Sequence, residues 1–266
     1  MPETKQINSI HRCVKVLEVL SQGVSQLEGI YPLLGLSKST THRLLKSLTA
    51  TGLAFQDPAT RLYHLGPTLL RLASNPRISH HMLAVCAENE LTRLNRITKE
   101  TSLIFVPRGL QRLVVKEVPS MLDVSFSFKE GSSSLIHIGS AGKLLLAMME
   151  EYELEAILHN IELIRFGPNT ITDKEVLRKE IDKVRKQGYS TSFGETQAGT
   201  AGISVPVKNY LYPTALCVVG PEFRFSPMDA LEQLRESAAR VSSNLSEVFE
   251  KIKLGVSKLT TGTSTS

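Results

Sequence analysis

The sequence lacks tryptophan, holds three cysteines, and contains no apolar run close to the roughly 18 residues that a membrane-spanning helix needs. Cys13, Cys86 and Cys217 lie far apart with no C-x-x-C pair, which argues against a disulfide framework or a structural zinc site. The first five residues are polar and lack the apolar segment of a signal peptide. We therefore expect a cytoplasmic protein without membrane segment, metal or cofactor, in which the cysteines act as small buried hydrophobes.

Motifs that carry catalysis are also missing. A phosphate-binding loop needs a glycine five residues before its Gly-Lys pair and a hydroxyl residue after it, but the Gly142-Lys143 pair has His137 and Leu144 at those positions. Ser140 is not surrounded by the G-x-S-x-G pattern of a nucleophile elbow. We therefore expect no enzyme, and we interpret residues 139–143 as a helix start whose free amides can bind an anionic or polar group.

The stretch from residue 35 to residue 48 predicts a sharp turn followed by a short helix with two unlike faces. Gly35 suits the positive φ of a tight turn, and Ser37 suits the helix N-cap. Leu44, Leu45 and Leu48 form one apolar stripe for packing inward. The opposite face carries hydrogen-bond donors and no acidic residue, which is the chemistry needed to read the major groove of DNA.

A solvated basic face on an ordinary surface helix is the simpler alternative. The charge distribution favours DNA, because residues 1–77 hold nine Lys or Arg and four Asp or Glu, whereas residues 78–266 hold 22 of each. All the excess positive charge of the chain, +5 in total, therefore belongs to the part that contains this helix. Such an asymmetry indicates a polyanionic partner.

The surroundings of this helix predict a winged helix-turn-helix domain over residues 1–77. Helical spacing of Ile10, Val14, Leu17 and Leu20 predicts that these residues face inward on a first helix, and a second helix follows over 25–34. Two short apolar runs at 53–55 and 62–65 flank an Asp-Pro turn signal and predict a hairpin, the wing. The residues expected to contact DNA are Ser37, Lys38, Ser39, Thr40, His42, Arg43 and Lys46, with Arg61 on the wing.

From Thr101 onward, alternation typical of strands mixes with helix patterns. Strand-like runs occur at 103–106, 113–115, 124–126, 188–193, 203–207 and 214–219. Helix patterns occur at 78–100, 141–150, 153–159, 174–187 (with Thr172 as N-cap) and 228–253. Because strict βαβ alternation is absent, we expect an α+β domain with a largely antiparallel sheet over 78–254, followed by a disordered tail over 255–266.

Seven short motifs occur in one order along nearly the whole chain: residues 36–45, 51–53, 63–66, 137–147, 188–190, 202–207 and 220–221. Together they resemble the IclR-type bacterial transcription regulators. The resemblance implies a winged helix-turn-helix, a linker helix, and a C-terminal α/β effector-binding domain of the GAF/profilin type. It also implies homodimers or homotetramers.

The resemblance places an effector pocket between the sheet and the helix that holds the Gly-Lys pair. Matched motif by motif, the pocket residues are Ser140, Ala141, Ser192, Glu195, Thr200, Gly202, Cys217 and Val219. Ser192 stands where the family commonly has Asp, Gly202 where it commonly has Cys, and Cys217 and Val219 where it usually has serines. Fewer polar anchors predict either a weakly polar or aromatic effector, or a pocket that barely functions.

Two functions remain after these observations. The first is a DNA-binding transcription regulator whose operator binding responds to a small-molecule effector. For this regulator, repression is favoured over activation. The second is a small-molecule sensor or enzyme whose basic N-terminal part only mediates assembly. The donor-rich helix and the charge distribution favour the first.

Overall fold

The computed structural model describes residues 8–73 and 79–258, with side chains for residues 9–73 and 79–251. The chain divides into two compact units, with the division between Ser79 and His80. The sequence predicts this boundary after residue 77. The last helix, α10 (Leu231–Lys258), continues past residue 255, where the sequence predicts the start of the tail. Residues 259–266 lie outside the described part.

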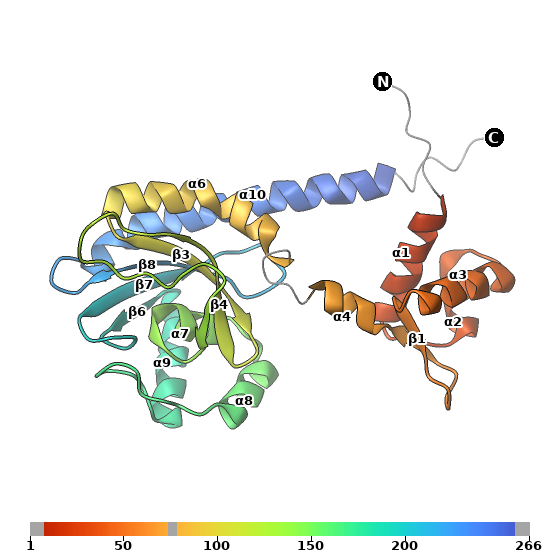
Figure 1. Cartoon of the computed structure of the whole chain (residues 1–266), viewed down its shortest axis with the longest axis horizontal. Coiled ribbons are helices and arrows are strands. Elements are labelled where there is room, and N and C mark those ends of the chain that lie inside the picture. Colours follow the sequence, from red (N-terminus) through yellow and green to blue (C-terminus); the bar gives the residue numbers. More distant parts are fainter. Residues whose placement is uncertain (1–7, 74–78, 259–266) are drawn as a thin grey trace, which may run out of the picture. The chain divides into compact units, whose positions relative to one another are not determined.

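The first unit is built from short helices and one hairpin (Figure 1). Its elements are α1 (Asn8–Ser21), α2 (Leu27–Leu34), α3 (Lys38–Ala50), β1 (Ala54–Gln56), β2 (Tyr63–Leu65) and α4 (Pro67–Ala73). Gly35 ends α2 in the left-handed conformation at φ 62°, and Gly52 follows α3 at φ 70°, as their places in the sequence predicted. β1 and β2 pair antiparallel, from Ala54 opposite Leu65 to Gln56 opposite Tyr63.

The core of this unit differs from the prediction in α1. Val16 and Leu20 are the buried residues of that helix, whereas Ile10 is 60% exposed and Val14 is 47% exposed. Ile10, Val14 and Leu17 share one helical stripe, but the stripe that meets the core cluster is centred on Val16 and Leu20. The expected inward position of Ile10 and Val14 is therefore wrong.

The second unit is an antiparallel sheet of six strands between two helical layers, which is the expected α+β class. In spatial order the strands are β5 (Ser133–Leu135), β4 (Gln111–Val118), β3 (Thr101–Arg108), β8 (Ala215–Pro221), β7 (Thr200–Pro206) and β6 (Ser190–Phe193). The sequence had placed a strand at 124–126 instead of 133–135. Val124 is 54% exposed there, and Ser133–Leu135 pairs with β4 at the sheet edge.

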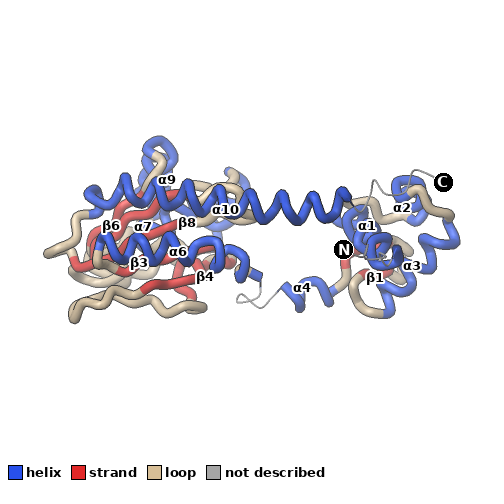
Figure 2. Tube along the Cα trace, turned by 90° about the horizontal axis from the view of Figure 1, so that it is seen from above, coloured by secondary structure: helices blue, strands red, loops and turns tan. Residues whose placement is uncertain are grey.

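The helices cover the two faces of this sheet. One face carries α6 (His81–Thr98), the turn η1 (Pro227–Ala230) and α10 (Leu231–Lys258), and the two long helices lie side by side in Figure 2. The other face carries α7 (Gly139–Ala147), α8 (Glu151–Asn160) and α9 (Lys174–Gln187). Asp173 caps α9 in place of the expected Thr172, because its Oδ1 accepts a hydrogen bond from the Val176 amide at 2.9 Å.

Candidate functional site

The third helix of the first unit presents polar side chains to solvent. Ser37 caps α3, and its Oγ accepts a hydrogen bond from the Thr40 amide at 3.2 Å, as predicted. Leu45 and Leu48 are buried beneath the helix, together with Thr41. The seven residues of this region expected to contact DNA are exposed apart from the half-buried Thr40: Ser37, Lys38, Ser39, Thr40, His42, Arg43 and Lys46.

A carboxylate that the sequence did not place on this face approaches it from α2. Glu28 Oε1 lies 2.9 Å from Lys38 Nζ, and both side chains are more than half exposed. An exposed ion pair of this kind is weak and is screened by salt. Lys38 is therefore partly neutralised, whereas no ion pair of Arg43 or Lys46 is found among the described residues.

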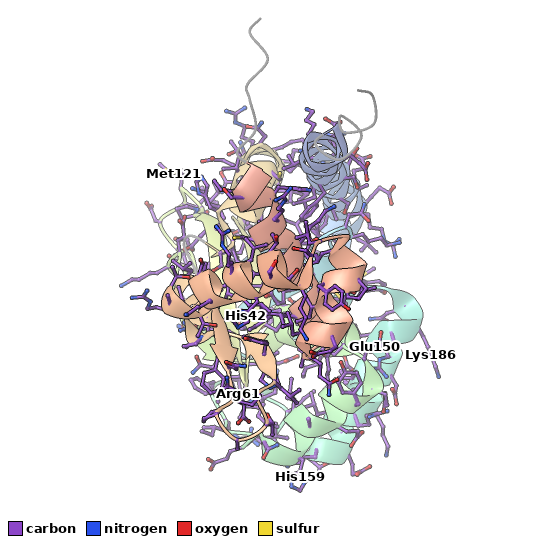
Figure 3. The ribbon with its side chains drawn as sticks, turned by 90° about the vertical axis from the view of Figure 1, so that its right-hand side faces the viewer. His42, Arg61, Met121, Glu150, His159 and Lys186 are labelled. Atoms are coloured by element: carbon purple, nitrogen blue, oxygen red, sulfur yellow. The ribbon has the colours of Figure 1, made fainter. Side chains whose placement is uncertain are left out.

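The wing ends in a turn shaped by hydrogen bonds to its own backbone. Asp57 Oδ1 accepts from the amides of Ala59 at 2.7 Å and Thr60 at 3.1 Å. Arg61 has a positive φ of 61°, and its carbonyl accepts a hydrogen bond from Gln56 Nε2 at 3.0 Å. Its side chain is exposed at the tip, below His42 of α3 in Figure 3.

In the second unit, several of the expected effector residues meet where α7 crosses β6, β7 and β8. Ser192 is the register partner of Gly202, which in turn is the partner of Val219. A Cβ atom on Gly202 would lie 3.2 Å from both Ser140 Oγ and Ser192 Oγ, and 3.4 Å from Val219 Cγ2. The glycine thus keeps room between the helix and the sheet.

The next row of the sheet adds hydroxyl and thiol groups. Ser140 Oγ lies 2.9 Å from Ser204 Oγ and 3.7 Å from Cys217 Sγ, and all three residues are buried. Burial raises the pKa of the Cys217 thiol, so it stays protonated near pH 7. Ser204 was not among the expected residues, although its place two positions after Gly202 puts it on the same face of β7.

Glu195 is a buried anchor of the α7 start. Its Oε1 lies 2.6 Å from Lys143 Nζ, and its Oε2 accepts a hydrogen bond from the Gly139 amide at 3.0 Å. Burial raises the pKa of this carboxyl above its ordinary value, while Lys143 and the Gly139 amide oppose the rise. Glu180 lies 3.5 Å from the same ammonium.

Two of the expected residues contribute differently. Ala141 is fully buried in the core cluster beneath α7. Thr200 lies on β7 two residues before Gly202, but its Oγ1 donates to the Gln197 carbonyl at 2.7 Å and lies 3.1 Å from Thr196 Oγ1. Its hydroxyl therefore closes the loop that carries Glu195.

Sequence reasoning missed one charged residue on this face, Arg112 of β4. The residue is 3% exposed, its Nε donates to Ser134 Oγ at 3.0 Å, and its guanidinium carbon lies 4.7 Å from the centre of the Phe105 ring. Burial lowers the pKa of this guanidinium to about 10, so it stays charged at pH 7. The sequence feature that could have identified Arg112 is the alternation of side chains between the two faces of β4. This alternation puts Arg112 on the same face as the buried Val114.

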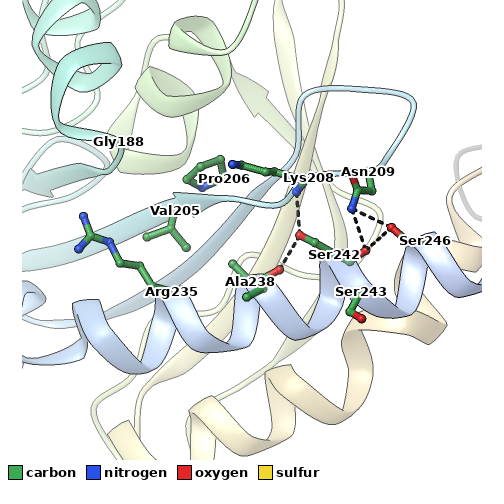
Figure 4. A pocket seen from close by; sticks show the side chains of 11 residues that line it. Gly188, Val205, Pro206, Lys208, Asn209, Arg235, Ala238, Ser242, Ser243 and Ser246 are labelled. Carbon is green, nitrogen blue, oxygen red and sulfur yellow. Dashed lines mark hydrogen bonds between the residues drawn. The ribbon is translucent and has the colours of Figure 1, made fainter.

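A cavity lies on the opposite face of the sheet. It has a volume of about 560 Å³ and opens between β7, the segment after it, and α10 (Figure 4). Polar groups of this cavity form hydrogen bonds with one another. Ser242 Oγ accepts from the Lys208 amide at 2.8 Å, and Asn209 Nδ2 donates to Ser246 Oγ at 2.8 Å. None of the expected effector residues lines it.

Within residues 8–73 and 79–258, no group of three or more His, Cys, Asp or Glu is placed to hold a metal ion. No helix in the same part is long and apolar enough to cross a membrane. Cys86 and Cys217 are buried free thiols, as expected, and Cys13 is partly buried.

Both parts of the chain match models of known protein domains. Residues 76–246 match the model of the bacterial transcriptional regulator IclR C-terminal domain, and residues 9–58 match the IclR helix-turn-helix domain. The chain belongs to the IclR family. This IclR-family protein is therefore a DNA-binding transcription regulator, and its relatives are named as regulators rather than enzymes.

Curated relatives extend over most of the chain. The regulator XynR of Escherichia coli is 29% identical over 77% of this chain and 81% of its own length. BhcR of Paracoccus denitrificans is 30% identical over 83% and 80%. The transcriptional repressor AllR of Salmonella typhi is 29% identical over 91% of each chain.

Solved structures share the fold. An IclR homolog from Microbacterium hydrocarbonoxydans, complexed with 4-hydroxybenzoate, is 26% identical and covers 90% of this chain and 99% of its own, with a TM-score of 0.60. The C-terminal domain of Escherichia coli KdgR is 28% identical and covers 62% of this chain and 98% of its own, with a TM-score of 0.54.

Proposed function

We propose that this IclR-family protein is a cytoplasmic repressor that binds a near-palindromic DNA operator as a dimer and responds to a small-molecule effector bound between α7 and the sheet. The observation that carries the proposal is the exposed donor face of α3, beneath which Leu45 and Leu48 are buried. A helix held in this way offers its N-terminal half to the major groove. The Salmonella relative AllR is named as a repressor, which supports repression here.

The donors on this face have separate roles in the proposal. Arg43 is exposed in the middle of α3, and a guanidinium pairs with guanine O6 and N7 through two hydrogen bonds. Lys38 and Lys46 hold phosphates, and Arg61 on the wing contacts phosphate or the minor groove. Ser37, Ser39, Thr40 and His42 complete the set of DNA contacts.

Dimerisation is supported by an apolar surface on the first unit. Ile10 and Val14 lie four residues apart on α1, and both are about half exposed or more. Exposed apolar side chains on one helical stripe favour association with a second copy. Two copies present two reading helices, which suits an operator with two half-sites.

The effector site is supported by the cluster around Gly202, where Ser140, Ser192 and Val219 meet. A homologous structure contains 4-hydroxybenzoate, which supports small-molecule binding in this fold. In the proposal Ala141 and Cys217 line the site, and Glu195 and Thr200 fix the loop beside it.

In the proposal, the sheet transmits effector binding to the DNA-binding unit. Cys217 and Val219 of β8 pair with Leu103 and Thr101 of β3. β3 begins directly after α6, and Ser102 Oγ donates to the Leu91 carbonyl of that helix at 2.7 Å. An effector that binds better to one position of α6 changes the spacing of the two reading helices, since a ligand shifts only those states that it binds unequally.

The test is a titration of the full-length protein against its own upstream intergenic DNA at two salt concentrations. We expect tight, salt-sensitive binding to one short site. Arg43→Ala should lose roughly 1–3 kcal/mol of discrimination at one base position. Lys46→Ala should weaken all sites alike and reduce the salt slope by about one unit.

Two outcomes would contradict this proposal. A Lys46→Ala variant that changes sequence preference with its salt slope intact would refute the separation of roles. Equal affinity for the upstream DNA and for random DNA, together with turnover of a small molecule, would favour a sensor or enzyme whose basic N-terminal part serves assembly.

A further inference from the structure

The cavity between β7 and α10 has one wall that hydrogen bonds hold in place. This wall is the segment after β7, in which Asn209 Nδ2 donates to the Ser242 carbonyl at 3.3 Å and to Ser246 Oγ at 2.8 Å. The Lys208 amide adds a third bond, to Ser242 Oγ at 2.8 Å. Asn209 has a positive φ of 63°, a conformation that is uncommon outside glycine and recurs at binding segments. The wall is therefore formed before any ligand arrives.

The lining between this wall and α10 is apolar. Val205 of β7 and Ala238 of α10 are both almost fully buried, and Pro206 is half-buried. The volume of about 560 Å³ falls within the range of roughly 300–1,000 Å³ that small-molecule sites occupy. A ligand in this cavity would therefore place a hydrocarbon segment against apolar side chains.

Two cations line the cavity from its two sides, and no acidic residue is among the described residues that line it. Lys208 belongs to the segment after β7 and Arg235 to α10, and Val205 and Ala238 lie between them in Figure 4. Both cations are exposed, and neither forms an ion pair with a residue that the structure describes. The Arg235 guanidinium carbon instead lies 5.7 Å from the centre of the Tyr189 ring.

Arg235 differs in this respect from the other described cations of α10. Arg240 lies 3.6 Å from a carboxylate oxygen of Glu90 and 3.6 Å from one of Glu236. Lys251 lies 3.9 Å from a carboxylate oxygen of Glu247. Those cations are neutralised within the fold, whereas the cavity keeps two positive charges that attract an anion.

We propose that this cavity is a second small-molecule site, and that it binds a linear dianion with an acidic group at each end of an apolar spacer. One acidic group pairs with Arg235, whose planar fork matches a carboxylate, and the other pairs with Lys208. The spacer lies against Val205 and Ala238. The inference goes beyond the proposed function, because the proposed effector site lies on the other face of the sheet and shares no lining residue with this cavity.

The first test is calorimetry on the full-length protein with succinate, glutarate, adipate and pimelate. Each dicarboxylate is compared with the unbranched monocarboxylate of the same chain length. We expect affinity to peak at one length, since one spacer lets both acids reach their cations, and we expect that dicarboxylate to bind more tightly than its monocarboxylate. No binding of any dicarboxylate up to about 10 mM, or equal binding of the best one and its monocarboxylate, would overturn the inference.

The second test removes the cations one at a time. Lys208→Met and Arg235→Met should each weaken the best dicarboxylate by roughly 3- to 10-fold, towards the affinity of the monocarboxylate. Arg96→Met is the matched control, because it removes an exposed cation of α6 that does not line the cavity. All three side chains are exposed, so the variants should keep the thermal midpoint of the wild-type protein. Undiminished binding to either cavity variant, or an equal loss in Arg96→Met, would refute the site.

The third test keeps both charges and fills the space. Ala239 is exposed on α10 and lines the cavity, so Ala239→Phe places a ring inside it without removing a cation. We expect this variant to weaken the dicarboxylate by about 10-fold, because the spacer loses its place against the apolar lining. Unchanged binding to Ala239→Phe would show that surface charge alone attracts the acid, and would overturn the proposal of a shaped site.

Discussion

His137 is a fully buried histidine whose two ring nitrogens have unequal surroundings. Its Nε2 lies 3.1 Å from the Ile164 carbonyl oxygen, which can only accept, so Nε2 carries the proton. Nδ1 has no partner among the described residues. Burial lowers the pKa of this imidazole, and the nearby Arg112 charge lowers it further, whereas the bond to Ile164 opposes the shift. The ring is therefore neutral in the folded protein near pH 7.

This asymmetry predicts a loss of stability in mild acid. Below the ordinary histidine pKa of 6.5, the unfolded chain binds a proton that the folded chain refuses, so stability falls as the pH drops towards the lower folded value. We expect the free energy of unfolding to fall between pH 7.5 and 5.5, with His137→Gln losing less than the wild-type protein by up to about 1.4 kcal/mol per pH unit. Denaturant titrations at the two pH values measure this difference.

A second histidine acts in the same direction and serves as the comparison. His80, whose Nδ1 lies 2.8 Å from Tyr210 Oη, also has its pKa lowered by burial. His80→Gln should remove a separate part of the same pH dependence, and the double variant should remove both. Equal losses in the wild-type and His137→Gln proteins would show that His137 does not contribute.

Among individual residues, those on the polar face of α3 were predicted well from the sequence, whereas the buried Arg112 of the second unit was not predicted. The Ser37 cap and the buried Leu45 and Leu48 follow from local spacing, because neighbours along a helix define its faces. Arg112 meets the start of α7 only through the pairing of distant strands and helices. Local spacing carries no information about such a contact.

The helix α7 is the element on which the second unit's site depends. Gly139 begins it with a positive φ of 74°, and a Cβ on Gly142 would lie 2.0 Å from the Ile136 carbonyl oxygen, so both positions require glycine. Glu195 then ties the helix start to the loop between β6 and β7 through Lys143 and the Gly139 amide. These contacts fix the start of α7 and therefore the position and orientation of Ser140.

Removing the Glu195 charge should loosen this element. Glu195→Gln leaves the buried Lys143 ammonium with Glu180 alone, at 3.5 Å, and we expect the free energy of unfolding to fall by about 3 kcal/mol. Glu180→Gln is the matched control, since the partly exposed Glu180 side chain should cost about 1 kcal/mol or less. Denaturant titrations measure both, and equal losses in the two variants would contradict the anchoring role.

Elements were predicted from the sequence more reliably than their ends and partners. The span of α9 was predicted correctly, yet Asp173 rather than Thr172 caps it, because both residues suit a cap and backbone geometry selects one. The apolar run at 124–126 resembled a strand, but the place beside β4 belongs to Ser133–Leu135. Pairing at a sheet edge is a tertiary choice that a run of three residues does not reveal.

At the scale of the whole molecule, the family fixes two kinds of domain in one chain, and the charge follows that division. The helix-turn-helix part carries the net positive charge of the sequence, whereas residues 78–266 are balanced. Long-range attraction to DNA therefore belongs to the first unit. In the proposed function the second unit contributes effector binding and, together with the apolar surface on α1, assembly. In the proposed dimer each protomer contributes one α3, so the dimer has two reading helices.

A dimer that reads two half-sites predicts a strict dependence on their spacing. Once a footprint defines the operator, inserting 5 base pairs between its halves rotates one half by about half a helical turn and moves it out of reach. We expect this insertion to weaken binding on the order of 100-fold, because the second reading helix loses its site while the first keeps its own. An insertion of 10 base pairs is the control for rotation, since it restores the face of the duplex and should bind more tightly than the 5-base-pair insertion. Gel-shift titrations measure both, and equal affinity for the native and the 5-base-pair operators would show that each protomer binds DNA independently.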